Sequence, residues 1–323
     1  MTKFIKFLKF LRNIWVVFGI ALAMFLGIEL GLDLFFRLKN SFAPSERYAN
    51  RRAKADTYTD SSWARSYFSE YDAAVERSGV MRWTPYAYWR MAPHQGNYIN
   101  VASDGIRRTH NNPAPENAAK TTRVFMLGGS TMWGIGVSDD STIPSIFSKE
   151  VNERRGAFEV TNFGQIGYVS TQDVIAMMLQ LQRGNIPDVA IFYGGFNDVI
   201  TAFRLKTPGL PYEEFNREIE FNLLKKKEVR GAAVKYTVTE LRTVGSFQRI
   251  GELLGLANGE VSYQRPLAWE QPIADKIALA QKVAEIYMNN ITMAHTLSRV
   301  YGFKCIFYLQ PAMFYKQRLT EYE

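Results

Sequence analysis

The longest apolar run of the chain lies near its beginning. It extends from Ile14 to Ile28, and counting on to Phe36 gives about the twenty residues that a bilayer-spanning helix needs. A cleavable signal peptide would have a shorter apolar core followed by a small-residue cleavage site. The pattern therefore predicts an uncleaved transmembrane anchor within residues 1–40, which contacts the lipid bilayer through residues 14–36.

Beyond residue 121 the pattern changes to short apolar runs that alternate with amphipathic segments. Strands are predicted at residues 123–128, 158–164, 188–195 and 303–311, and helices at 142–155, 171–183 and 273–301. Such alternation is typical of right-handed βαβ units, which build a parallel sheet with helices on both faces. We therefore predict a three-layer α/β/α domain over residues 121–323, interrupted by an insertion at 203–272.

Residues 41–120 separate the anchor from this domain and are expected to form a linker and an irregular segment. Their first part is polar and is expected to be a linker with some helix, and Pro, Gly and Asn breaks in the second part favour loops or a small hairpin. The aromatic residues between Trp83 and Trp89 could stack on sugar rings. Packing of the segment onto the domain is the favoured interpretation.

Charge supports a membrane partner. The formal net charge is +8, and positive residues crowd both sides of the first apolar run. The basic segment at the start predicts a cytoplasmic N-terminus and a single-pass protein of the inner membrane, with its domain on the periplasmic or extracellular side. We expect no nucleic-acid partner, because no basic stripe with interleaved aromatics and no helix-turn-helix or zinc pattern is present.

Three glycine-containing loops follow the first three predicted strands: GGST (128–131), NFGQIGY (162–168) and GGFND (194–198). In parallel sheets these strand ends share one edge, where the sites of α/β proteins lie. The first loop lacks the lysine of a phosphate loop, the spacing of a dinucleotide fingerprint and the elbow of the α/β-hydrolases. A serine at a helix start can act simply as a cap, but the two companion loops favour a nucleophile.

Ser130 follows a strand and precedes a helix, where backbone amides and the helix dipole favour negative charge on a substrate oxygen. Gly129 beside it lets a substrate approach the backbone closely. Gly167 can offer an unobstructed N–H, and Asn197 a side-chain amide. Together with the amide of Ser130 they would form a three-donor oxyanion hole.

Two further residues are weaker candidates for substrate binding. Gly164 ranks below Gly167 as a donor, because it could be only a turn glycine. Arg107 could bind an anionic or sugar substrate, although a solvated surface arginine is an equal alternative.

The three loops resemble the first three sequence blocks of the SGNH (GDSL-like) hydrolases: Gly-x-Ser, Asn-x-Gly-x-x-Gly and Gly-x-Asn-Asp. The resemblance covers about residues 100–311 and implies a flavodoxin-like fold, with Ser130 as nucleophile and Gly167 and Asn197 as oxyanion donors. DGIRRT (104–109), together with the single anchor, resembles a membrane-attached bacterial branch linked to acyl groups on cell-surface polysaccharides. A serine esterase, O-acyltransferase or deacylase acting on an acyl-ester substrate, for example on a polysaccharide, is therefore expected.

The last block of that family, Asp-x-x-His, has no match in the chain, whose histidines are His94, His110 and His295. The expectation is that the sequence is incomplete at its C-terminus and that the general base lies beyond residue 323. The main alternative is a catalytically inactive glycan-binding or scaffold protein, and a basic protein bound to anionic lipid is a third. No cofactor and no metal are expected, because the histidines are scattered. The oligomeric state is left open.

Overall fold

The computed structural model describes residues 2–42, 58, 61–76, 81–110, 112, 121–155, 157–212, 214, 217, 218, 221 and 275–312. The chain separates into two compact units. One comprises Met1–Pro44 and Glu218–Tyr263, and the other comprises Ser45–Arg217 and Gln264–Glu323. Most of the predicted insertion at 203–272 lies outside the described residues.

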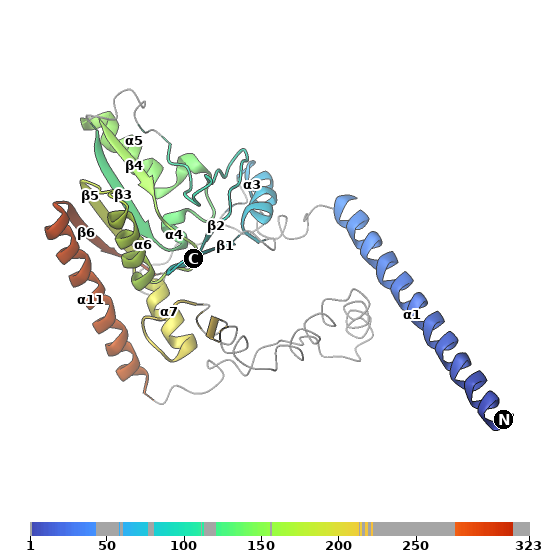
Figure 1. Ribbon diagram of the computed structural model, residues 1–323. Coiled ribbons are helices and arrows are strands. Elements are labelled where there is room, and N and C mark those ends of the chain that lie inside the picture. Colours follow the sequence, from blue (N-terminus) through green and yellow to red (C-terminus); the bar gives the residue numbers. More distant parts are fainter. Residues whose placement is uncertain are drawn as a thin grey trace. The chain divides into compact units, whose positions relative to one another are not determined.

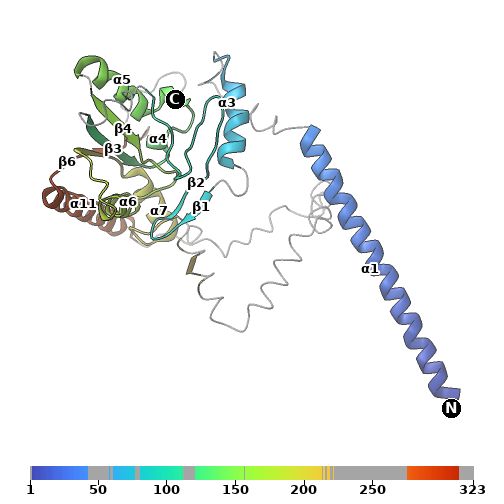
Figure 2. The same ribbon diagram turned by 45° about the horizontal axis from the view of Figure 1, so that its top comes forward.

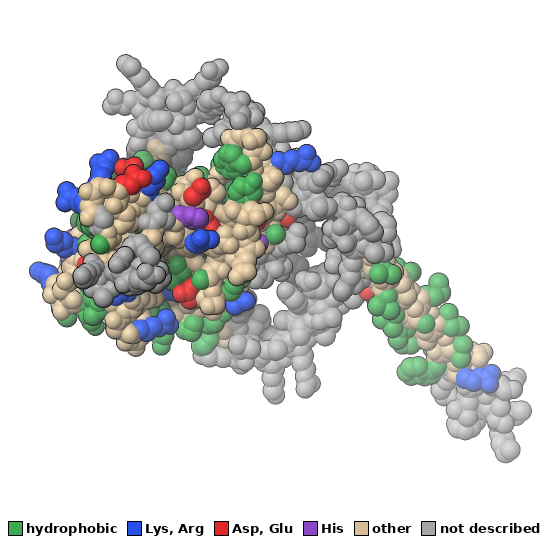
Figure 3. Space-filling model, turned by 90° about the horizontal axis from the view of Figure 1, so that it is seen from above, with side chains coloured by type: hydrophobic (Ala, Val, Ile, Leu, Met, Phe, Trp, Pro, Cys, Tyr) green, Lys and Arg blue, Asp and Glu red, His purple; other side chains and the backbone are tan. Residues whose placement is uncertain are grey.

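The first unit contains α1 (Thr2–Phe42), one continuous helix of 41 residues. Its stretch Arg12–Leu32 is long and apolar enough to cross a membrane, and none of it is buried. Hydrophobic side chains line α1 on the face shown in Figure 3. The predicted apolar helix is therefore confirmed as a candidate span, while its orientation stays a prediction.

The second unit is built on a parallel sheet with the strand order β4-β3-β5-β6 (Figure 1). The strands alternate along the chain with long helices, as βαβ units require. The bounds of these elements are β3 (Thr122–Gly128), α5 (Ile143–Arg155), β4 (Phe158–Asn162), α6 (Ser170–Gln182), β5 (Val189–Gly194), α11 (Lys276–Tyr301) and β6 (Lys304–Leu309).

Helices cover both faces of the sheet, because alternate side chains of a strand point in opposite directions. Phe125 and Leu127 of β3 belong to a core cluster shared with α6 and α11. Val124 and Met126 belong to another cluster, against which α5 packs. The predicted three-layer α/β/α architecture is confirmed, with element boundaries within three residues of those predicted.

One helix near the site was not predicted. α7 (Phe196–Leu205) starts directly after Gly195 and extends into the segment assigned to the insertion. Its first turn carries both Asn197 and Asp198. The sequence pattern predicts a loop at these two residues, whereas they lie in the first turn of a helix.

The segment predicted as linker and irregular structure contains regular elements in its described part. They are α3 (Ala64–Tyr71), a π-helical turn (Asp72–Glu76), and an antiparallel hairpin of β1 (Met81–Thr84) and β2 (Tyr88–Met91). Buried aromatic and aliphatic side chains of this segment enclose Trp133, which is fully buried. The described part of the segment therefore packs onto the domain, as the favoured interpretation of its aromatic residues predicted.

Candidate functional site at the strand ends

Ser130 lies at the end of β3, as predicted. It is the first residue of α4 (Ser130–Trp133), and Gly129 occupies the N-cap position. The alternative interpretation of Ser130 as the helix cap is therefore wrong. Its side chain is partly exposed, and its Oγ has no hydrogen-bond partner among the described residues. Because α4 is a single turn, its dipole is small, and the electrostatics of the site depend on individual N–H groups.

Asn197 reaches across from α7 to the serine loop. A Cβ atom on Gly129 would lie 2.5 Å from Asn197 Nδ2, so only glycine leaves room for this amide. The same Nδ2 donates a hydrogen bond to the Tyr168 carbonyl at 2.8 Å. One amide side chain thus contacts all three strand-end loops, and its second N–H hydrogen has no described acceptor.

The turn that carries Gly167 is fixed against the end of β3. The Gln165 N–H donates to the Gly128 carbonyl at 2.9 Å, and Gly167 adopts a φ of 81°, which favours glycine. Trp89 from the hairpin lies against this turn, because a Cβ on Gly167 would come within 3.5 Å of its ring. The Gly167 N–H has no acceptor within the described part of the chain. The structure therefore brings together Ser130, Gly167 and Asn197.

A buried network of hydrogen bonds supports the three strand-end loops. The Asp198 carboxylate accepts hydrogen bonds from the backbone N–H and the hydroxyl of Ser170, the first residue of α6. Asn290 of α11 donates to the Ser170 hydroxyl at 2.8 Å and to Thr171 at 3.0 Å. Through Ser170, the Asp198 carboxylate of α7 thus connects α7 with α6 and α11.

Gly164 and Arg107 are used inside the domain instead of facing the strand-end site. A Cβ on Gly164 would lie 2.5 Å from the backbone nitrogen of Trp133, and the Gly164 N–H donates to Asn162 Oδ1. Arg107 is completely buried and forms an ion pair with Asp139 at 2.8 Å. Neither polar group is presented to a substrate at the strand ends, which corrects the predicted role of Gly164. Arg107 belongs to the lining of the pocket described next, and its predicted substrate-binding role stays a prediction.

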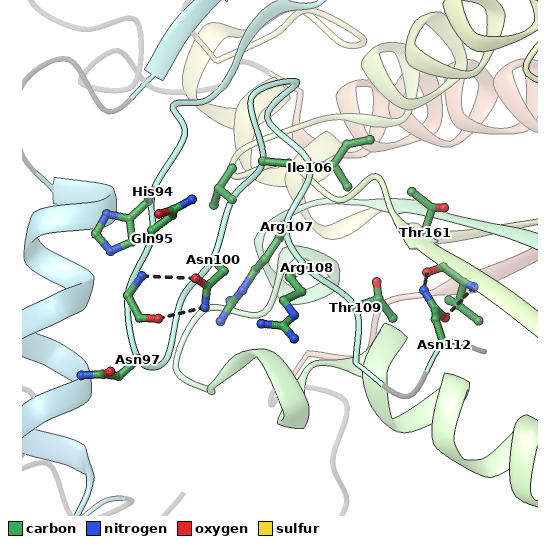
Figure 4. Close-up of a pocket in the computed structure, with 14 residues that line it drawn as sticks. His94, Gln95, Asn97, Asn100, Ile106, Arg107, Arg108, Thr109, Asn112 and Thr161 are labelled. Carbon is green, nitrogen blue, oxygen red and sulfur yellow. Dashed lines mark hydrogen bonds between the residues drawn. The ribbon is translucent and has the colours of Figure 1, made fainter. Parts of the chain in front are cut away.

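A separate pocket of about 750 Å³ opens beside the outer edge of β4 (Figure 4). His94, Asn97, Arg108, Thr109 and Thr161 are among its lining residues, and Ser130, Gly167 and Asn197 are not. His94 Nε2 lies 3.7 Å from the Glu70 carboxylate there. The pocket and the strand-end site are thus different places on the domain.

None of the three histidines contacts Ser130 within the described residues. His94 lines the separate pocket, and His295 has its ring 5.2 Å from the ring of Phe307. His110 lies next to the start of α5, where its backbone N–H donates to Ser145.

Asp173 is a functional-site candidate that the sequence pattern does not predict. It lies on α6 and is fully buried, with Oδ1 lacking a partner within the described chain. Burial raises its pKa well above the ordinary value, the charge of Asp198 raises it further, and a hydrogen bond from Gly128 opposes the shift. The only signal in the sequence is one carboxylate beside the apolar positions of a predicted helix.

We expect stability to fall with rising pH because of this group. Above the pKa of an unfolded aspartate, the folded protein keeps a proton that the unfolded chain releases. The free energy of unfolding then declines by up to about 1.4 kcal/mol per pH unit until the folded pKa is reached. Asp173→Asn should flatten this slope in urea unfolding between pH 4.5 and 7.5. Glu153→Gln, which removes an exposed carboxyl of α5, is the control, and an unchanged slope in Asp173→Asn would contradict the assignment.

Comparisons with known proteins show a likeness to solved structures. Neither a protein-family model nor a curated protein matches the chain. A crystal structure of AlinE4, an SGNH-hydrolase family esterase, aligns with 54% of this chain and 96% of its own at 15% identity, with a TM-score of 0.24. A likeness at this level carries no argument about function, which has to be drawn from the site itself.

Proposed function

We propose that the protein is a membrane-anchored serine hydrolase or acyltransferase of the SGNH type that acts on ester-linked acyl groups. The observation that carries this proposal is the position of the Asn197 amide, which touches Gly129 beside Ser130 and bonds to Tyr168 beside Gly167. A nucleophile and two independent donors then share one edge of a parallel sheet. This is the arrangement that acyl transfer requires.

In the proposed reaction, Ser130 Oγ attacks the acyl carbonyl carbon and the carbonyl oxygen becomes an oxyanion. The backbone N–H groups of Ser130 and Gly167 and the free N–H of Asn197 donate to that oxygen. The alcohol of the ester leaves with a proton, and water or a sugar hydroxyl then takes the acyl group from the serine. The proton of Ser130 passes to a base outside the described residues. Without that base, the oxyanion hole alone would give only residual catalysis.

The cellular setting is proposed from the candidate span. If α1 crosses the inner membrane with its basic start in the cytoplasm, the domain faces the periplasm or the exterior. Acyl esters on cell-surface polysaccharides would be available there. A bilayer-anchored enzyme would also meet such a substrate at high local concentration.

Ser130→Ala tests the nucleophile. The natively expressed protein, extracted in detergent, should react with a fluorophosphonate probe, and Ser130→Ala should lose the labelling because the reacting oxygen is gone. Ser103→Ala, at an exposed serine without a described hydrogen bond, should label like the unmodified protein. Peptide mapping of the labelled protein checks the site.

Absence of labelling in the unmodified protein, or equal labelling of Ser130→Ala, would contradict a serine hydrolase. Either result would favour the second candidate function, a catalytically inactive glycan-binding or scaffold protein at the membrane. The observation that favours this second candidate is that none of the three histidines contacts Ser130 within the described residues.

A further inference from the structure

The fourth strand, β6, ends at the same edge of the sheet as the three loops of the site. It forms the margin of the sheet opposite β4, beside β5 (Figures 1 and 2). The Gln310 N–H donates to the Gly194 carbonyl at 2.7 Å, which continues the pairing of β5 and β6 by one residue. Pro311 follows and restricts the Gln310 backbone to extended conformations. The direction of the Gln310 side chain is therefore well defined.

Leu309 and Gln310 reach two different helices of the site, because successive side chains of an extended chain point to opposite faces of the sheet. On one face, a Cβ atom on Gly195, the residue before α7, would lie 2.5 Å from the Leu309 side chain. On the other face, Gln310 Nε2 donates to the Thr131 hydroxyl of α4 at 2.9 Å. The end of β6 thus contacts the helix that carries the proposed nucleophile and the start of the helix that carries Asn197.

α4 needs such a contact because it is a single turn of four residues, and helices this short are marginal on their own. Gly129 and Gly134 at its two ends leave the adjoining backbone less restricted. The second half of α4 is anchored by Trp133, which is fully buried. Its first half carries Ser130 and Thr131, which are both partly exposed.

The contact with Gln310 holds this first half. Within the described chain it is the one side-chain hydrogen bond that Ser130 or Thr131 makes. Ser130 directly precedes Thr131, and consecutive Cα atoms are about 3.8 Å apart. A shift of Thr131 therefore moves the Oγ and the N–H of Ser130, which are the proposed nucleophile and one proposed oxyanion donor.

Building on the proposed function, we infer that Gln310 is a positioning residue for acyl transfer, which acts through Thr131. Its hydrogen bond fixes the direction of Ser130, while Leu309 beside it packs against the start of α7, which carries Asn197. One strand end thus aligns the nucleophile with an oxyanion donor. A displacement of about 1 Å at a reacting atom can cost on the order of 10²-fold in rate.

The kinetic test uses the natively expressed protein, extracted in detergent, with a short acyl ester and a fluorophosphonate probe. In Gln310→Ala, kcat and the second-order labelling rate should fall about 10–100-fold, while KM stays within a factor of two. Thr131→Val, which keeps the side-chain shape but loses the hydroxyl, should behave in the same way. Thr131→Ser keeps the hydroxyl and should retain most of the rate. Gln182→Ala, at an exposed glutamine of α6 without a described hydrogen bond, is the control.

A double-mutant cycle tests whether Gln310 acts through Thr131. Gln310→Ala combined with Thr131→Val should be no slower than either single variant, because both changes remove the same hydrogen bond. Independent effects that multiply, or an unchanged kcat in Gln310→Ala, would overturn the inference. A loss of rate in Thr131→Ser as large as that in Thr131→Val would also overturn it.

Hydrogen exchange followed by mass spectrometry gives a readout that does not depend on catalysis. The Trp133 and Gly134 amides close the turn of α4 with hydrogen bonds of 3.0 and 2.9 Å. Peptides that contain them should exchange at least tenfold faster in Gln310→Ala than in Gln182→Ala, while peptides from α5 should exchange at the same rate. A general loss of stability would speed exchange in α5 as well, and that result would overturn the inference.

The exchange measurement also separates this inference from the proposed function. Equal exchange of the α4 amides in Gln310→Ala and Gln182→Ala would overturn the inference even if the probe labels Ser130. Faster exchange confined to α4 supports the hold of Gln310 on the turn whether or not Ser130 is labelled. Failure of the positioning residue and failure of the nucleophile are thus distinguishable.

Discussion

Arg107→Met is expected to lower the free energy of unfolding by about 3–5 kcal/mol, because it leaves a buried charge without its partner. The Arg107 guanidinium bonds to Asp139 at 2.8 Å and to the carbonyls of Gly134 at 2.6 Å and Val137 at 2.8 Å. Methionine can replace the aliphatic stem of arginine but has no donors, so these oxygens would lose their hydrogen bonds. Urea unfolding followed by tryptophan fluorescence measures the loss.

Arg108→Met is the matched control for this variant. Arg108 is the next residue, but its side chain is exposed and has no partner within the described chain. Its replacement should change stability by no more than about 0.5 kcal/mol. Equal effects of Arg107→Met and Arg108→Met would show that the Asp139 pair contributes little. Adding Asp139→Asn to Arg107→Met should recover part of the loss, because the unpaired charge is then removed.

Asn197→Ala is expected to slow acyl transfer by about 10²–10³-fold, the cost of removing one oxyanion donor. The amide also bonds to the Tyr168 carbonyl, so its loss loosens the turn that presents the Gly167 N–H. The second-order rate of fluorophosphonate labelling and the turnover of a short acyl ester are the two measurements. Both should fall while the far-ultraviolet circular dichroism is unchanged.

Asn289→Ala controls for the loss of an exposed asparagine. Asn289 lies on α11 and has no described hydrogen bond, so its removal should leave the labelling rate within a factor of two. If Asn197→Ala labels as fast as Asn289→Ala, Asn197 is not an oxyanion donor. The nucleophilic role of Ser130 would then need a different set of donors.

The meeting of the three loops could be predicted because it follows from topology. Once strand and helix alternate, the ends of β3, β4 and β5 must lie on one edge of the sheet. The proximity of Ser130, Gly167 and Asn197 could therefore be predicted from order and spacing, while their catalytic roles stay predictions. The contact between Gly129 and Asn197 could not be found this way, because it depends on where α7 starts. No apolar periodicity long enough to reveal that helix was present.

The errors concern burial, which a single sequence does not display. Arginine is usually a surface residue, yet Arg107 is enclosed with Asp139, a partner 32 residues away. Gly164 looks like another amide donor, whereas its lack of a Cβ serves the close approach of α4. Asp173 was overlooked because a charged residue on a helix is usually solvated. In each case the deciding neighbour is distant in the chain.

The packed layer beneath α4 bears on how a soluble fragment of this protein should be designed. Cutting at residue 121, where the sheet begins, would remove the side chains that enclose Trp133 and would also remove Arg107. The turn that carries Ser130 would then rest on an open hydrophobic surface. A fragment for crystallisation should therefore begin before Trp63, so that α3 and the aromatic hairpin remain with the domain.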